Sequence, residues 1–209
     1  MRILVTAFEP YDQWEKNSSW EALIALLSER GASPKIITRR YPVDLARLRS
    51  RIETDLAQGV DAVLHLGQAP GISELHFEAI ALNVAGVGLT QNGEYAEIVD
   101  DAPVAYRTSF PIGDWVKELQ SMSIPASVSY HAGTYLCNAA MFLSHHWFVR
   151  RQEQPLVGFI HLPLTPEQIT ANGSNYGGAS MPIQQTSRAI ERIIDRILAL
   201  PTDNQTELT

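Results

Sequence analysis

Short apolar runs alternate with longer amphipathic segments along most of the chain. The runs suited to buried strands lie at 2–6, 35–41, 61–67, 76–84, 106–110, 126–130 and 156–162. Apolar positions at helical spacing predict helices at 18–29, 44–58, 113–120, 138–150 and 182–200. Strands that alternate with helices favour a parallel sheet covered on both faces. The pattern therefore predicts an α/β fold: a single three-layer α/β/α domain with an open, twisted, mostly parallel sheet.

Polar residues mark where several of these segments begin and end. Ser18 or Ser19 is expected to cap the first helix, and Asp44 the second. Glycine and asparagine are frequent over 85–105, which predicts a hairpin or long loop outside the core. The polar stretch 165–180 predicts a loop near the functional site. We see no linker, so we expect one domain over 1–200 and a disordered tail over 201–209.

The composition excludes several classes of function. The 209 residues carry a formal net charge of −7 without a run of Lys and Arg, which gives no support for binding nucleic acid or an anionic membrane. No apolar run approaches the roughly 20 residues that span a bilayer. The first residues also lack the apolar core of a signal peptide. We therefore expect a cytoplasmic protein.

The chain contains one cysteine, Cys137. A lone cysteine makes no internal disulfide and no multi-cysteine zinc site, so it is either a buried apolar side chain or a reactive thiol. Composition alone favours the buried side chain. The position of Cys137 between a predicted strand and a helix favours the reactive thiol, because helix N-termini stabilise thiolates and receive oxyanions. Gly133 allows a tight turn just before it.

A cysteine nucleophile needs a base and a third group that orients the base. Three of the six histidines lie inside predicted elements: His65, His145 and His146. His76 and His131 lie near strand ends and stay possible. His161 fits best, because it lies near the carboxyl end of a predicted strand, where α/β sheets bind ligands. Glu78 lies in an otherwise apolar strand and needs a partner there, either for folding alone or to orient a histidine.

Several segments resemble the motifs of one cysteine peptidase family, pyroglutamyl peptidase I. They are RILVTAFEP at 2–10, GQA at 67–69, FEAIALN at 77–83, AGTYLCN at 132–138, and GFIHLP at 158–163 with PEQ at 166–168. The matches follow the family's order, and the cysteine and histidine motifs together are highly specific. In this resemblance Cys137, His161 and Glu78 occupy the positions of the nucleophile, its base and the residue that orients the base.

The resemblance implies an enzyme that removes an N-terminal pyroglutamyl residue from a peptide through an acyl-enzyme. It implies no metal or organic cofactor. Its expected partners are peptides with N-terminal pyroglutamate and further copies of the chain, as a dimer or tetramer. The substrate-binding residues that it implies are Phe8, Tyr11, Asn17, Gln68 and Leu89.

Departures from the family's motifs gather around the expected pocket. They are Ala7, Tyr11, Pro70, Ala79 and Gly88, where the family usually has Gly, Phe, Gly, Arg and Arg. Judged from the residues alone, Phe8 and Tyr11 could instead pack their loop, and Asn17 could cap the first helix. Two other functions stay open: a cysteine hydrolase of the same fold that acts on another acyl group, and a binding protein without catalysis.

Overall fold

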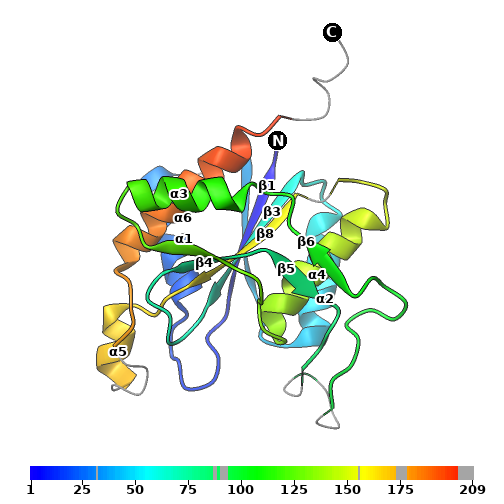
Figure 1. Ribbon diagram of the computed structural model, residues 1–209, viewed down its shortest axis with the longest axis horizontal. Coiled ribbons are helices and arrows are strands. Elements are labelled where there is room, and N and C mark those ends of the chain that lie inside the picture. Colours follow the sequence, from blue (N-terminus) through cyan, green and yellow to red (C-terminus); the bar gives the residue numbers. More distant parts are fainter. Residues whose placement is uncertain (32, 87–88, 90–93, 155, 173–177, 202–209) are drawn as a thin grey trace.

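A six-stranded sheet forms the centre of the molecule. The structure is a computed structural model that describes residues 1–31, 33–86, 89, 94–154, 156–172 and 178–201. The strands of this sheet are β1 (Ile3–Phe8), β2 (Ile36–Tyr41), β3 (Ala62–Gln68), β4 (Leu75–Glu78), β7 (Ala126–Ser129) and β8 (Val157–Leu162). Their spatial order is β2-β1-β3-β8-β4-β7 (Figure 1). All neighbouring strands pair in parallel except β4 and β8, so the sheet is mostly parallel, as predicted.

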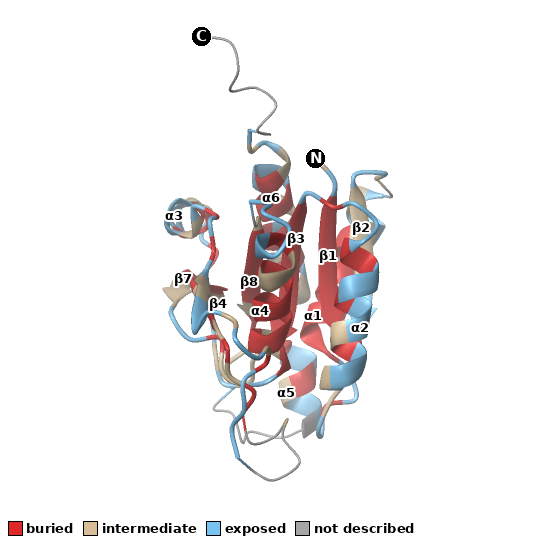
Figure 2. Ribbon diagram, turned by 90° about the vertical axis from the view of Figure 1, so that its right-hand side faces the viewer, coloured by how far each residue is buried: buried red, intermediate tan, exposed pale blue. Residues whose placement is uncertain are grey.

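Helices cover both faces of this sheet and give the predicted three layers (Figures 1 and 2). One core cluster lies against α1 (Ser18–Arg30), α3 (Ile112–Ser121) and α6 (Ile183–Leu198). The other lies against α2 (Leu45–Leu56) and α4 (Leu136–Val149). Strand β1 shows how the sheet supplies both clusters: Ile3 and Val5 face the first, and Leu4 faces the second. Burial on both faces explains why the inner strands β1, β3 and β8 are mostly apolar, whereas the edge strand β2 contains Arg39 and Arg40.

The single strand predicted over 76–84 is wrong, because the chain leaves the central sheet at Ala79. It continues as β5 (Ile80–Leu82), which pairs antiparallel with β6 (Ala105–Arg107) in a second sheet of two strands. The side chain of Asn138 on α4 holds β5 there. Its Oδ1 accepts from Leu82 N at 2.7 Å, and its Nδ2 donates to Leu82 O at 2.9 Å. These hydrogen bonds to α4 take the place of pairing between β5 and a strand of the central sheet.

Two predictions about the helix ends fare differently. Asp44 caps α2 as predicted, with its side chain accepting from Arg47 N at 2.8 Å. The first helix is capped by Asn17 rather than by Ser18 or Ser19. The Asn17 Oδ1 accepts from Ser19 N at 3.0 Å, so the helix begins one residue after the side chain that caps it.

Two predicted loops contain more structure than expected. The stretch 165–180 includes a short helix, α5 (Pro166–Asn172), while 173–177 lie outside the described residues. The stretch 85–105 contributes Ala85 and Ile98 to the core, and its residues 87–88 and 90–93 are not described. The predicted tail, apart from Pro201, also lies outside the described residues. In the part of the chain that is described, no helix combines the length and apolarity needed to cross a membrane.

Candidate active site

Cys137 lies in the first turn of α4. The helix begins after Tyr135, which makes no side-chain capping hydrogen bond, and Gly133 two residues earlier has a left-handed φ of 78°. The first intrahelical bond runs from Ala139 N to Tyr135 O. The N–H groups of the first helical residues, including Cys137, therefore point outward from the helix end and can receive an anion.

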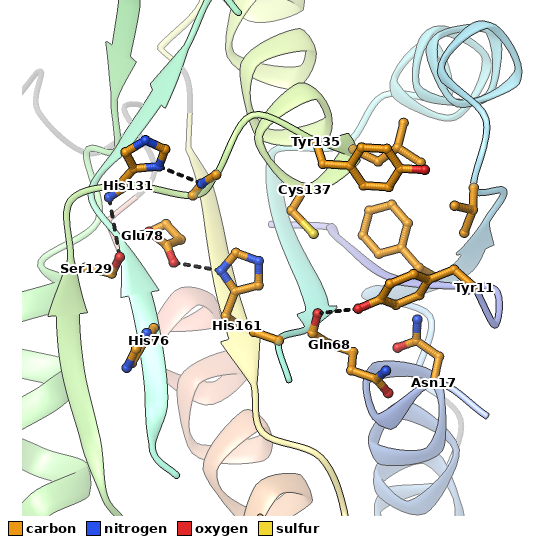
Figure 3. Close-up of a pocket in the computed structure, with 16 residues that line it drawn as sticks. Tyr11, Asn17, Gln68, His76, Glu78, Ser129, His131, Tyr135, Cys137 and His161 are labelled. Atoms are coloured by element: carbon orange, nitrogen blue, oxygen red, sulfur yellow. Dashed lines mark hydrogen bonds and ion pairs between the residues drawn. The ribbon is translucent and has the colours of Figure 1, made fainter. Parts of the chain in front are cut away.

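The antiparallel pairing of β4 with β8 brings Glu78 to His161. His76 lies opposite His161 in this pairing, so Glu78, two residues further along, is its diagonal neighbour on the same face of the sheet. The Glu78 Oε1 lies 2.7 Å from His161 Nδ1, with the two side chains only 1% and 12% exposed. Figure 3 shows the other ring nitrogen turned toward Cys137. This geometry suits an imidazole that donates from Nδ1 to Glu78 and faces the thiol with Nε2.

The surroundings of His161 favour its charged form. Burial lowers the pKa of the imidazole, but the charge and hydrogen bond of Cys137 raise it, and so do the hydrogen bond and charge of Glu78. Together they raise the pKa of His161 from 6.5 to about 10. The Glu78 Oε2 atom is buried and has no hydrogen-bond partner among the described residues. The carboxylate therefore acts on His161 in a site from which water is largely excluded.

The other histidines have different surroundings. His65 is buried and bonded to Thr6 and Ser144, and burial, with a smaller effect of His145, lowers its pKa to about 3. Burial also lowers the pKa of His145 to about 4. Both side chains are therefore neutral structural groups. His131 accepts from Gly133 N through Nδ1 at 2.8 Å.

Cys137 and His161 lie in the wall of a cavity of about 340 Å³. Four of the five predicted substrate-binding residues also line it, namely Phe8, Tyr11, Asn17 and Gln68. Tyr11, Asn17 and Gln68 lie on one side of Cys137, while His76, Ser129 and His131 lie on the other side of His161 (Figure 3). Phe8 and Gln68 end the parallel strands β1 and β3, which is why residues 60 positions apart in the chain meet at one edge of the sheet.

Leu89, the fifth predicted binding residue, is not among the residues that line this cavity. It packs against the α2 and α4 side of the core and donates from its backbone N–H to Gly86 O at 2.8 Å. Its neighbours Val87, Gly88 and Thr90 lie outside the described residues. A substrate contact at Leu89 therefore stays a prediction.

Asn17 both lines the cavity and caps α1. Its Oδ1 accepts from the backbone N–H and the hydroxyl of Ser19, and its Nδ2 donates to Glu9 O at 3.0 Å. Its amide is thus used mainly to shape the loop between β1 and α1. The alternative drawn from the sequence, a helix cap, is therefore also present in the structure.

Several cavity residues were not singled out in the sequence. They include Val43, Ser129, Ala132 and Tyr135. Proximity to the cysteine motif was an available signal for Ala132 and Tyr135, whereas Val43 follows β2 and meets the site only through the strand order. Within the described residues, no group of three or more His, Cys, Asp and Glu side chains could hold a metal ion.

Because Gly67 has no side chain, the Phe159 ring and the Cys137 thiol can lie close to its backbone. A Cβ added there would lie 2.5 Å from the Phe159 ring and 3.0 Å from Cys137 Sγ. The Phe159 side chain is buried and packs on the His161 ring, with centroids 4.7 Å apart, so it cannot move away freely. We expect Gly67→Ala to lower kcat at least about tenfold and to destabilise the fold by about 1–3 kcal/mol.

Gly113→Ala provides the matched control, since an added Cβ at Gly113 meets nothing within 4 Å and the residue lies in helix α3. That change is expected to leave kcat unaltered and to stabilise the helix slightly. Turnover kinetics and thermal unfolding measure both variants. Equal kcat in wild type and Gly67→Ala would show that the thiol does not need this space.

The fold and the site together have the form of a thiol hydrolase built on a parallel α/β sheet. A sequence model of the family described as pyroglutamyl peptidase matches residues 1–199. The chain therefore belongs to the pyroglutamyl peptidase family, and it is a cysteine-type exopeptidase.

Individual relatives agree with this assignment. The chain is 38% identical over 174 residues to a pyrrolidone-carboxylate peptidase of Thermococcus kodakarensis, covering 80% of this chain and 84% of the relative. It is 29% identical over 206 residues to one of Bacillus cytotoxicus, covering 96% and 94%. Among solved structures, a variant of the pyrrolidone carboxyl peptidase of Pyrococcus furiosus superposes with a TM-score of 0.86 at 32% identity, covering 95% of this chain and 98% of the other.

Proposed function

We propose that this protein hydrolyses the amide bond after an N-terminal pyroglutamyl residue, with Cys137 as nucleophile, His161 as base and acid, and Glu78 as the residue that orients His161. One observation carries the proposal: the 2.7 Å contact between Glu78 and His161 beside a thiol at an uncapped helix N-terminus. A nucleophile, a base and an orienting group within reach of one another are what acyl transfer requires.

In the proposed reaction the thiolate of Cys137 attacks the pyroglutamyl carbonyl carbon, and a C–S bond forms. The oxyanion lies against the free N–H groups at the start of α4. The protonated His161 donates its Nε2 proton to the leaving amine as the C–N bond breaks, which leaves a thioester on Cys137. His161 then removes a proton from water, which attacks the thioester and regenerates the thiolate–imidazolium pair with the free acid as product.

The cavity favours a neutral, flat acyl group. Two aromatic side chains, Phe8 and Tyr11, line it. The Gln68 and Asn17 amides lie beside Tyr11 (Figure 3). The Glu78 carboxylate bonds His161 through Oε1 and its side chain is almost fully buried, so it offers little surface to a substrate cation. A lactam offers flat faces to the aromatic rings and a carbonyl and an N–H to the amides.

The substrate class is tested with three amides of one fluorescent amine: pyroglutamyl, prolyl and alanyl. The prolyl ring lacks the lactam oxygen, and its nitrogen is a basic amine instead of a neutral amide N–H. We expect turnover of the pyroglutamyl-amide and at least about 100-fold lower kcat/KM for the prolyl-amide, because buried polar groups would lose their partner. Turnover of none of the amides would contradict the proposal, and equal turnover of two would favour a cysteine hydrolase with another acyl specificity.

Chemical modification tests the site without turnover. Iodoacetamide is expected to alkylate Cys137, the single cysteine, and 2-pyrrolidone is expected to slow the reaction because the lactam fills the cavity beside the thiol. Intact-mass measurement over time gives the rate. An alkylation rate that is independent of 2-pyrrolidone would contradict lactam binding in this cavity.

A cytoplasmic location and a homo-oligomeric state remain part of the proposal. Fractionation of cells that express the protein tests the first. Light scattering on the purified protein tests the second.

A further inference from the structure

Two glutamine side chains meet behind the polar end of the cavity. The Oε1 atom of Gln68 accepts from Ser18 N at 2.7 Å and from Gln168 Nε2 at 2.7 Å. The same Gln168 Nε2 donates to Lys16 O at 3.0 Å. Both glutamines are almost fully buried, at 5% and 6% exposed. Gln168 thus links α5 to β3 and to the loop before α1, the two segments that form this end of the cavity.

Backbone groups determine how both amides are oriented. Thr165 N donates to Gln168 Oε1 at 2.9 Å, and a backbone N–H can only face an oxygen. The Gln168 amide must therefore turn its NH2 toward Lys16 O and Gln68. By the same argument, Ser18 N and the Gln168 NH2 both require the oxygen of Gln68.

This arrangement leaves the Gln68 NH2 as a free donor. The Gln68 Nε2 atom is buried and has no hydrogen-bond partner among the described residues. Figure 3 shows the Gln68 amide beside Asn17 at the cavity. A buried donor without a partner is costly, and a ligand carbonyl oxygen that accepts from it would remove that cost.

Capping of α5 explains why the side-chain oxygen of Gln168 is needed, but not why its amide nitrogen is needed. Thr165 and Gln168 form a reciprocal capping box at the start of α5, in which Gln168 N also donates to Thr165 Oγ1 at 3.3 Å. That cap uses only the side-chain oxygen of Gln168, and a glutamate caps equally well. The NH2 group instead donates to Lys16 O and Gln68 Oε1.

We propose that Gln168 is a positioning residue for substrate recognition: it holds the Gln68 amide with its NH2 group turned toward the cavity, where that group donates to the lactam carbonyl oxygen. A Gln68 amide turned the other way would present an oxygen to the lactam carbonyl and repel it. This inference rests on the proposed function and assigns part of its specificity to a residue outside the cavity wall.

Gln168→Glu separates the two roles of this side chain. The carboxylate keeps the cap with Thr165 but cannot donate to Gln68, so the Gln68 amide loses its fixed orientation. We expect the concentration of 2-pyrrolidone that halves the alkylation rate of Cys137 to rise about tenfold. The alkylation rate without ligand should stay within about twofold of wild type. For a pyroglutamyl-amide, KM should rise while kcat changes little.

Glu167→Gln is the matched control, because Glu167 is the exposed neighbour on α5 and takes no part in this network. It should leave protection and KM unchanged. Gln168→Met removes the donor without adding a charge; it should raise the half-protecting concentration several-fold, and it tests the proposal if Gln168→Glu does not fold. Equal protection of wild type and Gln168→Glu would overturn the role of Gln168. A wild type that 2-pyrrolidone does not protect would instead contradict the proposed function.

Discussion

Replacement of Cys137 by alanine is expected to lower kcat/KM for a pyroglutamyl-amide by at least about 10⁴-fold, because no other group can form the acyl-enzyme. Among the residues that line the cavity, Cys137 is the only thiol, and the chain has no second cysteine. The N–H groups at the start of α4 remain in the variant, so some oxyanion stabilisation survives. A residual rate above about 1% of wild type would contradict the nucleophilic role.

The same variant has a spectroscopic signature. The charge and hydrogen bond of Cys137 are the strongest influences that raise the pKa of His161, which is about 10 in the intact site. Without them, burial lowers the pKa and only Glu78 opposes it. An NMR titration should therefore show His161 losing its proton at lower pH in Cys137→Ala than in wild type. Binding of 2-pyrrolidone, measured by calorimetry, should be retained, which separates loss of chemistry from loss of fold.

The fold could largely be predicted from the sequence, because burial on both faces leaves a strong pattern. Strands β1 and β3 are buried throughout, β8 is buried except at His161, and all three consist mostly of apolar residues; helix α6 has a clear apolar stripe. The error over 76–84 falls where the hydrogen bonds of one side chain decide the outcome. Asn138 holds Leu82 away from the central sheet, and nothing in the apolar run 76–84 reveals that contact.

The site was predictable only in part from local pattern. A cysteine at a strand-to-helix turn and a buried glutamate each indicated chemistry, but five histidines besides His161 competed for the role of base. The pairing that settles their geometry, β4 antiparallel to β8, joins segments 83 residues apart and leaves no local trace. Motif resemblance supplied what periodicity could not, because it identifies Cys137, His161 and Glu78 together.

The polar end of the cavity shows a further limit. The sequence identified Gln68 through a motif, yet the orientation of its amide depends on Ser18 N and on Gln168, which lies 100 positions later. Such a network has no sequence period, since each partner is fixed by the fold rather than by spacing. Specificity in this protein is therefore less visible in the sequence than its chemistry.

Replacement of Glu78 by glutamine is expected to lower kcat by about 10²- to 10⁴-fold while leaving the nucleophile in place. The isosteric amide can still accept from His161 Nδ1, but it carries no charge to stabilise the imidazolium. The hydrogen bond and charge of Glu78 both raise the pKa of His161, so the pKa must fall in the variant. The charge of Cys137 remains in Glu78→Gln. The pKa of His161 therefore falls less than it would if both Cys137 and Glu78 were replaced.

The direction of the pH effect follows from the proposed role of His161 as the acid that protonates the leaving amine. Its protonated form is the active one, so activity declines as pH rises through its pKa. In wild type the alkaline decline of kcat/KM is therefore expected near pH 10, and in Glu78→Gln it should move to lower pH. Glu74→Gln is a suitable control, because Glu74 contacts His76 at 3.6 Å rather than His161. If kcat/KM declines at the same alkaline pH in wild type and Glu78→Gln, Glu78 does not stabilise the imidazolium. This conclusion would hold however much the rate falls in the variant.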